Sequence, residues 1–316
     1  MKKISIIGLG VVGRVTSLMA LEYGFAVDIY DKNSLSSEDS ASYIAGGMIS
    51  PISELDYCSS DILEYYSFSM NWWKKIEQEI KVDLKIKDTL ICAFQQDASE
   101  LELIKKRIRL TKNPISENVP CKLGFTGFKI PREGFLNPRK FFRSSNRFFQ
   151  NHKKCHFFQK KLSNDLPGLE GSIIDCRGIG AKNLKNLRGV RGELLEVFAK
   201  NVQIDHIVRL YHPRYPLYII PRGAGLFSLG ASMIESDDNS AISVRTSLEI
   251  LTTAVSYDEG FLEARILNSL VGIRPTFPSS LPKICKNKNS ISINGVFRNG
   301  YLYAPSLAHK VLREII

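Results

Sequence analysis

Short apolar runs alternate with longer segments of helical spacing from the start of the chain. Residues 4–7 are mostly apolar, apolar positions recur with helical spacing over residues 11–23, and residues 26–30 form a second strand-like run that ends at Asp31. Short apolar runs bounded by turn signals are typical of buried strands in parallel sheets. The first 31 residues therefore predict one strand–helix–strand (βαβ) unit.

The rest of the chain mixes the same two patterns. Helical spacing recurs over residues 61–80, 99–111 and 244–254. Strand patterns cover residues 82–94, 171–178, 191–197, 217–221 and 226–231, and we expect a closing strand region over residues 295–303. Residues 33–42 are polar and predict a loop, while Pro and Gly divide residues 114–138 into short pieces. We expect an α/β fold whose doubly wound sheet is discontinuous in sequence.

A glycine pattern fills the turn between the first strand and the first helix. It consists of Gly8-Leu9-Gly10-Val11-Val12-Gly13. In a dinucleotide-binding unit, Gly8 would permit the tight turn, Gly10 would let a pyrophosphate approach the backbone, and Gly13 would allow the helix to pack closely on the strand. The helix start supplies N–H groups and a positive dipole end for the phosphates.

Asp31 stands at the end of the second strand, where an acid can accept hydrogen bonds from an adenosine ribose. An acid there would repel a 2′-phosphate, which favours FAD or NAD over NADP. The residues of this unit do not distinguish FAD from NAD.

Charge and cysteine content argue against several other classes of function. The 316 residues include 43 Lys and Arg against 32 Asp and Glu, a net charge of +11. These charges are dispersed and lack an RNA-binding signature, so we expect no nucleic-acid partner. Six cysteines without a C-x-x-C pair fit neither a disulfide framework nor a zinc ribbon and indicate a reducing, cytoplasmic location.

We expect neither a membrane span nor a metal site. No apolar stretch approaches the roughly 18 residues that a membrane span needs. His152 and His156 have ligand-like spacing, but they lie in a basic stretch with little pattern, so we expect no metal site.

Several segments beyond the glycine turn share one resemblance. Residues 41–51, Ala-Ser-Tyr-Ile-Ala-Gly-Gly-Met-Ile-Ser-Pro, resemble the second flavin-binding stretch of the D-amino acid oxidase-like flavoenzymes, in particular the glycine oxidases of thiamine biosynthesis. Five later segments match the same subfamily in order, at residues 191–193, 212–222, 229–235, 272–275 and 297–300.

The resemblance implies non-covalently bound FAD and a set of cofactor-binding residues. It implies an FAD-binding half of Rossmann type, assembled from residues 1–75, 132–188 and 270–316, and a substrate half with an antiparallel sheet, residues 76–131 and 189–269. The implied cofactor residues are Gly8, Gly10, Val11, Val12, Gly13, Asp31, Lys32, Ala41, Ser42, Gly46, Gly47, Met48, Gly272, Phe297, Arg298, Asn299, Gly300, Tyr301 and Leu302.

Four residues are implied at the substrate: Arg274, Tyr218, Met233 and Arg298. Arg274 would bind the carboxylate, for which a guanidinium fork offers two charge-assisted hydrogen bonds. Tyr218 would help to hold it, Met233 would line the pocket, and Arg298 would pass beside the flavin. From the residues alone, a structural ion pair for Arg274 and a core tyrosine for Tyr218 would be the first interpretations.

The implied reaction is the oxidation of glycine to the imine of glyoxylate, with O2 reduced to hydrogen peroxide. The resemblance also implies that the imine is delivered to thiazole synthase. Whether the chain forms a homo-oligomer stays open. Alternatives are a related oxidase or dehydrogenase of D-amino acids or sarcosine, an FAD-binding protein without catalysis, and an NAD-dependent reductase.

The sequence departs from the family pattern at two places. The family's Gly-His-x-Arg-x-Gly motif has valine in place of histidine, at Val296. Residues 137–175 are short for the family, which would trim a strand meander that contacts FAD and weaken its binding. The context of Cys285 does not match family members that attach flavin covalently.

Overall fold

A six-stranded, mostly parallel sheet forms one half of the computed structural model, which describes residues 2–55, 60–117, 119, 121–163, 166, 168–212, 216–287 and 290–316. Its strand order is β13-β14-β7-β1-β2-β6, and every neighbouring pair is parallel except β13 and β14. The strands are β1 (Lys3–Ile7), β2 (Ala26–Asp31), β6 (Cys155–Gln159), β7 (Ser172–Asp175), β13 (Lys283–Lys286) and β14 (Ser290–Asn294). The apolar central strand β1 is buried from Ile4 to Ile7, as a parallel sheet covered by helices requires.

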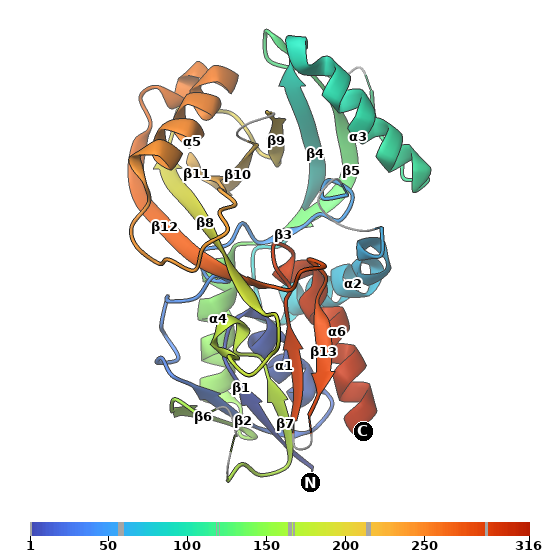
Figure 1. Ribbon diagram of the computed structural model, residues 1–316, viewed down its shortest axis with the longest axis vertical. Coiled ribbons are helices and arrows are strands. Elements are labelled where there is room, and N and C mark those ends of the chain that lie inside the picture. Colours follow the sequence, from blue (N-terminus) through green and yellow to red (C-terminus); the bar gives the residue numbers. More distant parts are fainter. Residues whose placement is uncertain are drawn as a thin grey trace.

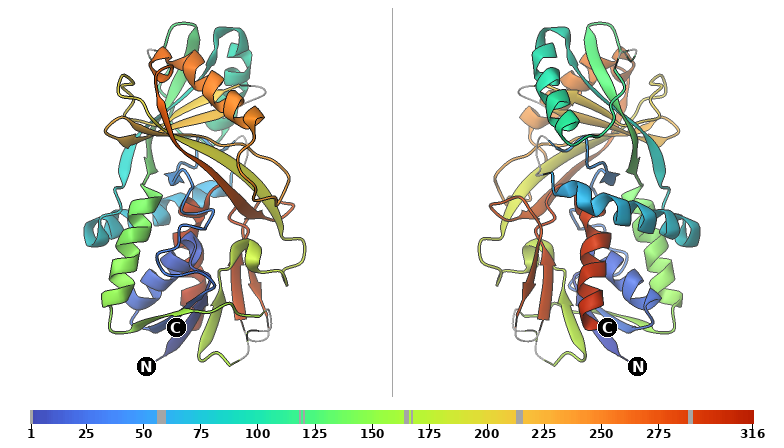
Figure 2. Two further views of the ribbon diagram at one scale, coloured as in Figure 1. Left: turned by 90° about the vertical axis from the view of Figure 1, so that its left-hand side faces the viewer. Right: turned by 90° about the vertical axis from the view of Figure 1, so that its right-hand side faces the viewer.

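Helices α1 (Val11–Glu22), α4 (Pro138–Asn151) and α6 (Gly300–Ile315) gather on one side of this sheet, and α2 (Ile62–Ile80) packs against α6 (Figure 2). Nearly every residue of α1 is buried between the sheet and α6, which explains its apolar sequence. Helix α4 begins where Asn137 accepts a hydrogen bond from the Lys140 amide and Pro138 takes the first helical position.

The other half is an eight-stranded sheet of order β12-β8-β11-β10-β9-β4-β5-β3, antiparallel except for the β4–β9 pair. Figure 1 shows it above the six-stranded sheet, with β8 and β12 extending down toward that sheet. Its strands are β3 (Met48–Ile49), β4 (Lys85–Phe94), β5 (Phe125–Phe135), β8 (Arg188–Phe198), β9 (Val208–Tyr211), β10 (Leu217–Gly223), β11 (Leu226–Gly230) and β12 (Arg265–Thr276).

Helix α3 (Ala98–Leu110) covers β4, and α5 (Val244–Tyr257) covers β8, β10 and β11 with a second apolar core. Short 3-10 turns complete the fold at η1 (Gln95–Asp97), η2 (Gly178–Gly180) and η3 (Glu259–Phe261). Among the residues that the structure describes, no helix is long and apolar enough to cross a membrane.

The predicted mixed α/β fold is confirmed, including the N-terminal βαβ unit and the strand at residues 172–175 that returns to the same sheet. Two local predictions are wrong. Residues 295–303, expected as a strand region, contain no strand. Residues 300–303 begin α6, because the chain turns at Gly295 with φ +75° and then presents a buried face of helical spacing up to Leu312.

The second correction concerns residues 114–138, where a broken segment was expected. Residues 125–135 form one long strand, β5. Pro131, which cannot donate to a neighbouring strand, falls at the irregularity where the β4–β5 register shifts between Lys87 and Thr89. The strand therefore continues past the proline.

Two strands cross the boundaries that were predicted between the two halves. The boundary between residues 131 and 132 falls within β5, and the boundary at residue 270 falls within β12. We retain the division as a proposal, with the two sheets as its cores.

Candidate active site

A cavity of about 780 Å³ is bounded by residues of both sheets. The six-stranded sheet contributes the ends of β1 and β2 and the segments that follow β7 and β14. The eight-stranded sheet contributes residues of β8, β10, β11 and β12. A cavity of this size is within the range of roughly 300–1,000 Å³ in which proteins bind cofactors and small ligands.

The glycine turn forms one wall of the cavity. Gly8 has φ +88°, and a Cβ there would lie 2.7 Å from the Arg177 Cα, so only glycine fits without strain. A Cβ at Gly13 would lie 1.9 Å from the Gly8 carbonyl oxygen, which shows how closely α1 packs on the turn. Helix α1 begins at Val11 and presents its first-turn N–H groups at the cavity.

Two polar side chains fix the surroundings of this turn. The Asp31 carboxylate accepts hydrogen bonds from the amides of Leu9 (2.6 Å) and Asn33 (2.8 Å). The Ser42 hydroxyl accepts one from the Val11 amide at 3.0 Å. Asp31 and Ser42 are therefore held beside the helix start, and both line the cavity.

Most of the predicted cofactor residues line this one cavity. Those in the lining are Gly8, Gly10, Val11, Val12, Asp31, Lys32, Ala41, Ser42, Gly46, Gly47, Met48, Gly272, Phe297, Arg298, Asn299, Gly300 and Tyr301. Gly13 lies behind the turn, and Leu302 is fully buried in the core. The region between residues 137 and 175 also reaches the cavity, through Lys160, Lys161 and Leu162.

The Arg274 guanidinium packs against strand β8 at Gly192, and both residues line the cavity. A Cβ at Gly192 would lie 2.1 Å from the Arg274 Nη2, so glycine at this position makes room for the guanidinium. Nη1 donates to the Ser232 carbonyl at 3.0 Å and weakly to the Arg191 carbonyl at 3.5 Å. Within the described part of the chain no carboxylate pairs with Arg274. Burial lowers its pKa to about 10, so the group is still charged at neutral pH.

A buried acid that the sequence did not single out joins Tyr218 and Arg298. Glu54 is 2% exposed, receives hydrogen bonds from Arg298 Nε (3.0 Å) and Nη2 (3.2 Å), and accepts one from the Tyr218 hydroxyl. Burial opposes ionisation of Glu54, but the charges of Arg298 and Arg209 outweigh it and lower its pKa. The carboxylate is therefore ionised at neutral pH.

Arg209 is a second residue beside Tyr218 that the sequence did not single out. It is fully buried, donates to the Ser53 carbonyl, and places its guanidinium carbon 5.5 Å from the Tyr218 ring centre. The only sequence signal for Glu54 is its position three residues after Pro51, which ends the second flavin-binding stretch. Arg209 has none beyond its place three residues before the segment at 212–222 that resembles the family.

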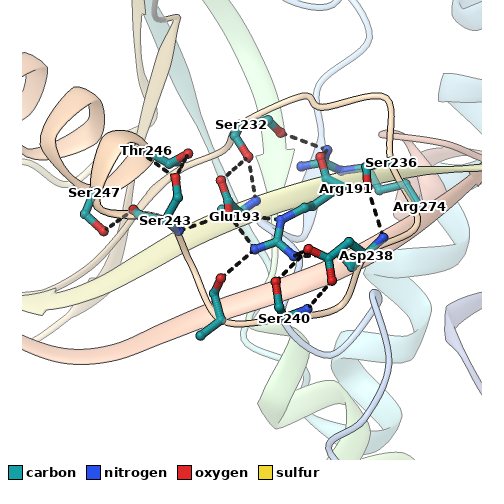
Figure 3. A network of polar contacts seen from close by, with 11 residues as sticks. Arg191, Glu193, Ser232, Ser236, Asp238, Ser240, Ser243, Thr246, Ser247 and Arg274 are labelled. Carbon is teal, nitrogen blue, oxygen red and sulfur yellow. Dashed lines mark hydrogen bonds and ion pairs between the residues drawn. The ribbon is translucent and has the colours of Figure 1, made fainter.

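Two residues of β8, Arg191 and Glu193, form a buried ion pair and hold the segment between β11 and α5 through hydrogen bonds (Figure 3). Arg191 Nη2 lies 2.7 Å from Glu193 Oε1, and Arg191 also donates to the carbonyls of Asp238 and Ala241. Burial opposes ionisation of Glu193, but hydrogen bonds, those from Thr246 and Arg191 foremost, lower its pKa.

This segment carries Met233 and Ser232. Ser232 bonds to Glu193 with its hydroxyl and to Arg274 with its carbonyl. Met233, expected in the pocket lining, lies outside it with 48% of its surface exposed, and its sulfur is 3.9 Å from Arg298 Nη1. Residues 213–215 of the predicted segment at 212–222 lie outside the described residues.

Comparison with known proteins identifies the family. The profile of the family described as FAD dependent oxidoreductase matches residues 3–313. The chain belongs to this family. It is 30% identical, over 99% of its length and 96% of the other protein, to a Rhizobium etli protein provisionally named thiamine biosynthesis oxidoreductase ThiO. Over 42% of the chain and 36% of the other protein, it is 29% identical to a glycine oxidase of Bacillus licheniformis.

Solved structures share the fold. The glycine oxidase of Geobacillus kaustophilus aligns with a TM-score of 0.83 and 19% identity, covering 100% of this chain and 95% of that one. The iminodiacetate oxidase of Chelativorans sp. BNC1 aligns at 0.81 and 17%, covering 97% and 93%. The predicted resemblance to D-amino acid oxidase-like flavoenzymes is confirmed, and the protein is an FAD-dependent amino-acid oxidoreductase.

The site residues fit the cofactor of the family. The N-terminal turn of α1 offers N–H donors to a pyrophosphate, and Asp31 stands at the end of β2. The walls are narrow where the flavin-binding stretch passes: a Cβ at Gly46 would lie 2.7 Å from Ile220, and one at Gly272 would lie 2.6 Å from Ile44. Glycine at these positions leaves the cavity open to a flat ligand.

Proposed function

We propose that the protein is a glycine oxidase that forms the imine of glyoxylate and reduces O2 to hydrogen peroxide. The observation that carries the proposal is the setting of Arg274, a buried guanidinium that lines the cofactor cavity and is held by main-chain carbonyls. Similarity to the glycine oxidase of Bacillus licheniformis supports glycine as the substrate.

Arg274 has donors to spare for a substrate carboxylate. Nη1 bonds to main-chain carbonyls, while Nε and Nη2 donate no hydrogen bond to the residues that the structure describes. A carboxylate can accept both of these donors side by side, with the orientation that a guanidinium fork imposes. This binding fixes the substrate's carboxyl end and therefore the direction of its Cα–H bonds.

The charges of the site favour the form of glycine that can react. Three guanidinium groups, on Arg209, Arg274 and Arg298, face one carboxylate, on Glu54. This excess of positive charge stabilises an anionic amino acid with a neutral amine over the zwitterion. A neutral amine has the lone pair that forms the C=N bond when the Cα–H bond breaks as hydride.

Bound FAD supplies the two-electron acceptor for this hydride. The protein's own part is to orient and to stabilise charge, so no acid or base side chain is required at Cα. Glu54 holds the Arg298 guanidinium and the Tyr218 hydroxyl in fixed positions at the cavity wall.

A buried thiol supports non-covalent attachment of FAD. The five cysteines in the described residues are free; Cys285 lies on β13 outside the cavity, and Cys176 lines it. Burial raises the pKa of the Cys176 thiol, so the reactive thiolate is not populated at neutral pH.

Peroxide release from a panel of amines tests the proposed substrate. Glycine, sarcosine, D-alanine and iminodiacetate are each supplied to the purified holoprotein in air. The proposal expects the highest kcat/KM for glycine. A higher value for another amine would keep the enzyme class and replace the substrate, and flavin reduction without peroxide would indicate a dehydrogenase.

We further propose that the imine product is passed to thiazole synthase in the cytoplasm, which the name of the Rhizobium relative supports. Restoration of growth without thiamine in a bacterial strain lacking its own ThiO tests this role. Size-exclusion chromatography with light scattering decides whether the enzyme is a monomer or a homo-oligomer.

A further inference from the structure

Arg14 is a buried cation surrounded by neutral acceptors. It follows Gly13 in the first turn of α1, is 2% exposed, and lines the cavity. Its Cζ lies 4.0 Å from the centre of the Phe142 ring. Its guanidinium donates to Leu9 O (3.1 Å), Ser145 Oγ (2.8 Å), Asn146 Oδ1 (2.6 Å), Leu35 O (3.3 Å) and Phe142 O (3.4 Å).

Among the residues that the structure describes, no carboxylate oxygen lies within 4 Å of the guanidinium nitrogens of Arg14. Two other arginines that line the cavity form ion pairs, Arg177 with Asp175 and Arg298 with Glu54. Arg14 resembles Arg274 instead, since both line the cavity without a carboxylate within 4 Å in the described chain; the charges of Asp31 and Glu54 act on them only from farther away.

A buried cation without a carboxylate in contact is costly unless a ligand supplies the opposite charge. Removal from water destabilises a buried cation, and desolvation lowers the pKa of Arg14 to about 10, which still leaves it charged. The positive end of the α1 dipole lies in the same turn and adds to the cost. An anion bound at this turn would relieve both.

We propose that Arg14 is a cofactor-binding residue whose charge neutralises the pyrophosphate of FAD at the start of α1. Its acceptors come from three segments: the glycine turn, the loop after β2 and helix α4. These contacts hold the guanidinium in place before FAD arrives and connect the segments around the nucleotide half of the cavity. The short region between residues 137 and 175 thereby takes part in cofactor binding, through Ser145 and Asn146.

FAD affinity of charge-keeping and charge-removing variants tests this role. Arg14→Met and Arg14→Gln remove the charge, the second retaining a hydrogen-bond donor, and Arg14→Lys keeps the charge. The control is Arg245→Met, which removes one positive charge from an exposed site on α5. The dissociation constant is measured from the FAD fluorescence released when each purified holoprotein is diluted.

The proposal expects Kd for FAD to rise about tenfold or more in Arg14→Met and Arg14→Gln, because a charge-assisted interaction is lost. Arg14→Lys should lie between these variants and the wild type, and Arg245→Met should match the wild type. Should Arg14→Met fail to fold, the Lys and Gln variants still decide. Equal affinity of these two, or wild-type affinity in Arg14→Gln, would make Arg14 a structural clamp and overturn the proposal.

Discussion

Arg274 is the residue on which the proposed substrate depends most. Arg274→Ala should raise KM for glycine about 100-fold, because two charge-assisted hydrogen bonds to a carboxylate contribute about 3 kcal/mol together. FAD content should persist, since Arg274 donates only to main-chain carbonyls of the described substrate-side segments. Steady-state peroxide assays and the flavin-to-protein absorbance ratio measure both effects.

Arg274→Lys is the matched control for charge. It keeps a cation but loses the planar fork, so its KM should lie between those of the wild type and Arg274→Ala. Loss of FAD from Arg274→Ala, with unchanged turnover of glycine per bound flavin, would show that Arg274 does not bind the carboxylate.

Glu54 gives a prediction on the acid side of the pH scale. Its pKa is lower in the folded protein than in the unfolded chain, so its ionisation stabilises the fold above about pH 4.5. That stabilisation disappears as the pH falls through the lower, folded-state pKa. Glu54→Gln should therefore lower Tm at pH 7, and its Tm should converge with that of the wild type in strong acid.

Thermal unfolding of both proteins between pH 3 and pH 8 measures this difference. A Tm gap of the same size at every pH would mean that Glu54 acts by packing rather than by its charge. Glu54→Asp, which keeps the charge on a shorter side chain, should retain the pH dependence.

Residues that belong to a short sequence motif could be predicted from the sequence. Gly8, Gly10 and Asp31 belong to one local motif, and their spacing predicts the strand–turn–helix–strand geometry in which they lie. Glu54 could not be found in this way, because its partners Tyr218 and Arg298 lie 164 and 244 positions away. Only the folded chain brings the three together.

At the scale of elements, the Arg191–Glu193 pair on β8 controls the segment that leads from β11 to α5. Glu193→Gln would leave the buried Arg191 guanidinium with only the exposed Asp238 carboxylate, 3.7 Å away, as a counter-charge. Loss of the buried partner of such a pair typically costs about 3–5 kcal/mol of stability. Because Ser232 of this segment bonds to both Glu193 and Arg274, KM for glycine should also rise. Chemical denaturation and peroxide assays measure the two effects.

The double variant Arg191→Met/Glu193→Met is the control for this pair. Replacing both partners removes the unpaired charge, so most of the stability lost in Glu193→Gln should return. A double variant as unstable as Glu193→Gln would show that specific hydrogen bonds, rather than the unpaired charge, dominate at this place.

A second buried acid links strand β5 to the turn that carries Glu54. Glu133 Oε1 accepts hydrogen bonds from the amides of Ile52 (2.9 Å) and Ser53 (3.0 Å). Burial raises its pKa to about 7, so its ionisation destabilises the fold as the pH rises from about 4.5 to about 7. Glu133→Gln should remove a pH-dependent loss of about 3 kcal/mol.

The stability of Glu133→Gln relative to the wild type should therefore increase between pH 5 and pH 8. Denaturant unfolding at both pH values measures it, and Glu64→Gln on the exposed face of α2 serves as the surface control. A relative stability that is the same at pH 5 and pH 8 would contradict the assigned titration.

Elements with a single strong period could be predicted, and elements shaped by distant partners could not. The apolar helix α1 and strands β1 and β2 follow from local pattern. Strand β5 contains Pro131 and Gly127, which suggest breaks, yet pairing with β4 along its whole length stabilises it. Helix α6 starts at Gly300 and contains Pro305, so its local signals point away from the helix that packing on α1 supports.

The interleaving of two sheets in one chain exceeds what periodicity can predict. The strands of the six-stranded sheet come from residues 3–31, 155–175 and 283–294, with the eight-stranded sheet drawn largely from the residues between. The resemblance to a known family supplied this arrangement, and the cavity between the sheets unites the glycine turn with Arg274. Oxidation of an amino acid by bound FAD requires both in one place.

Anaerobic addition of glycine to the purified holoprotein tests this union most directly. Oxidised flavin absorbs at ~450 nm, and the transfer of two electrons from the substrate to the flavin removes that band. We predict that glycine bleaches the band and that air restores it with the formation of hydrogen peroxide. A yellow protein whose absorbance glycine leaves unchanged would contradict the proposal that this enzyme oxidises glycine.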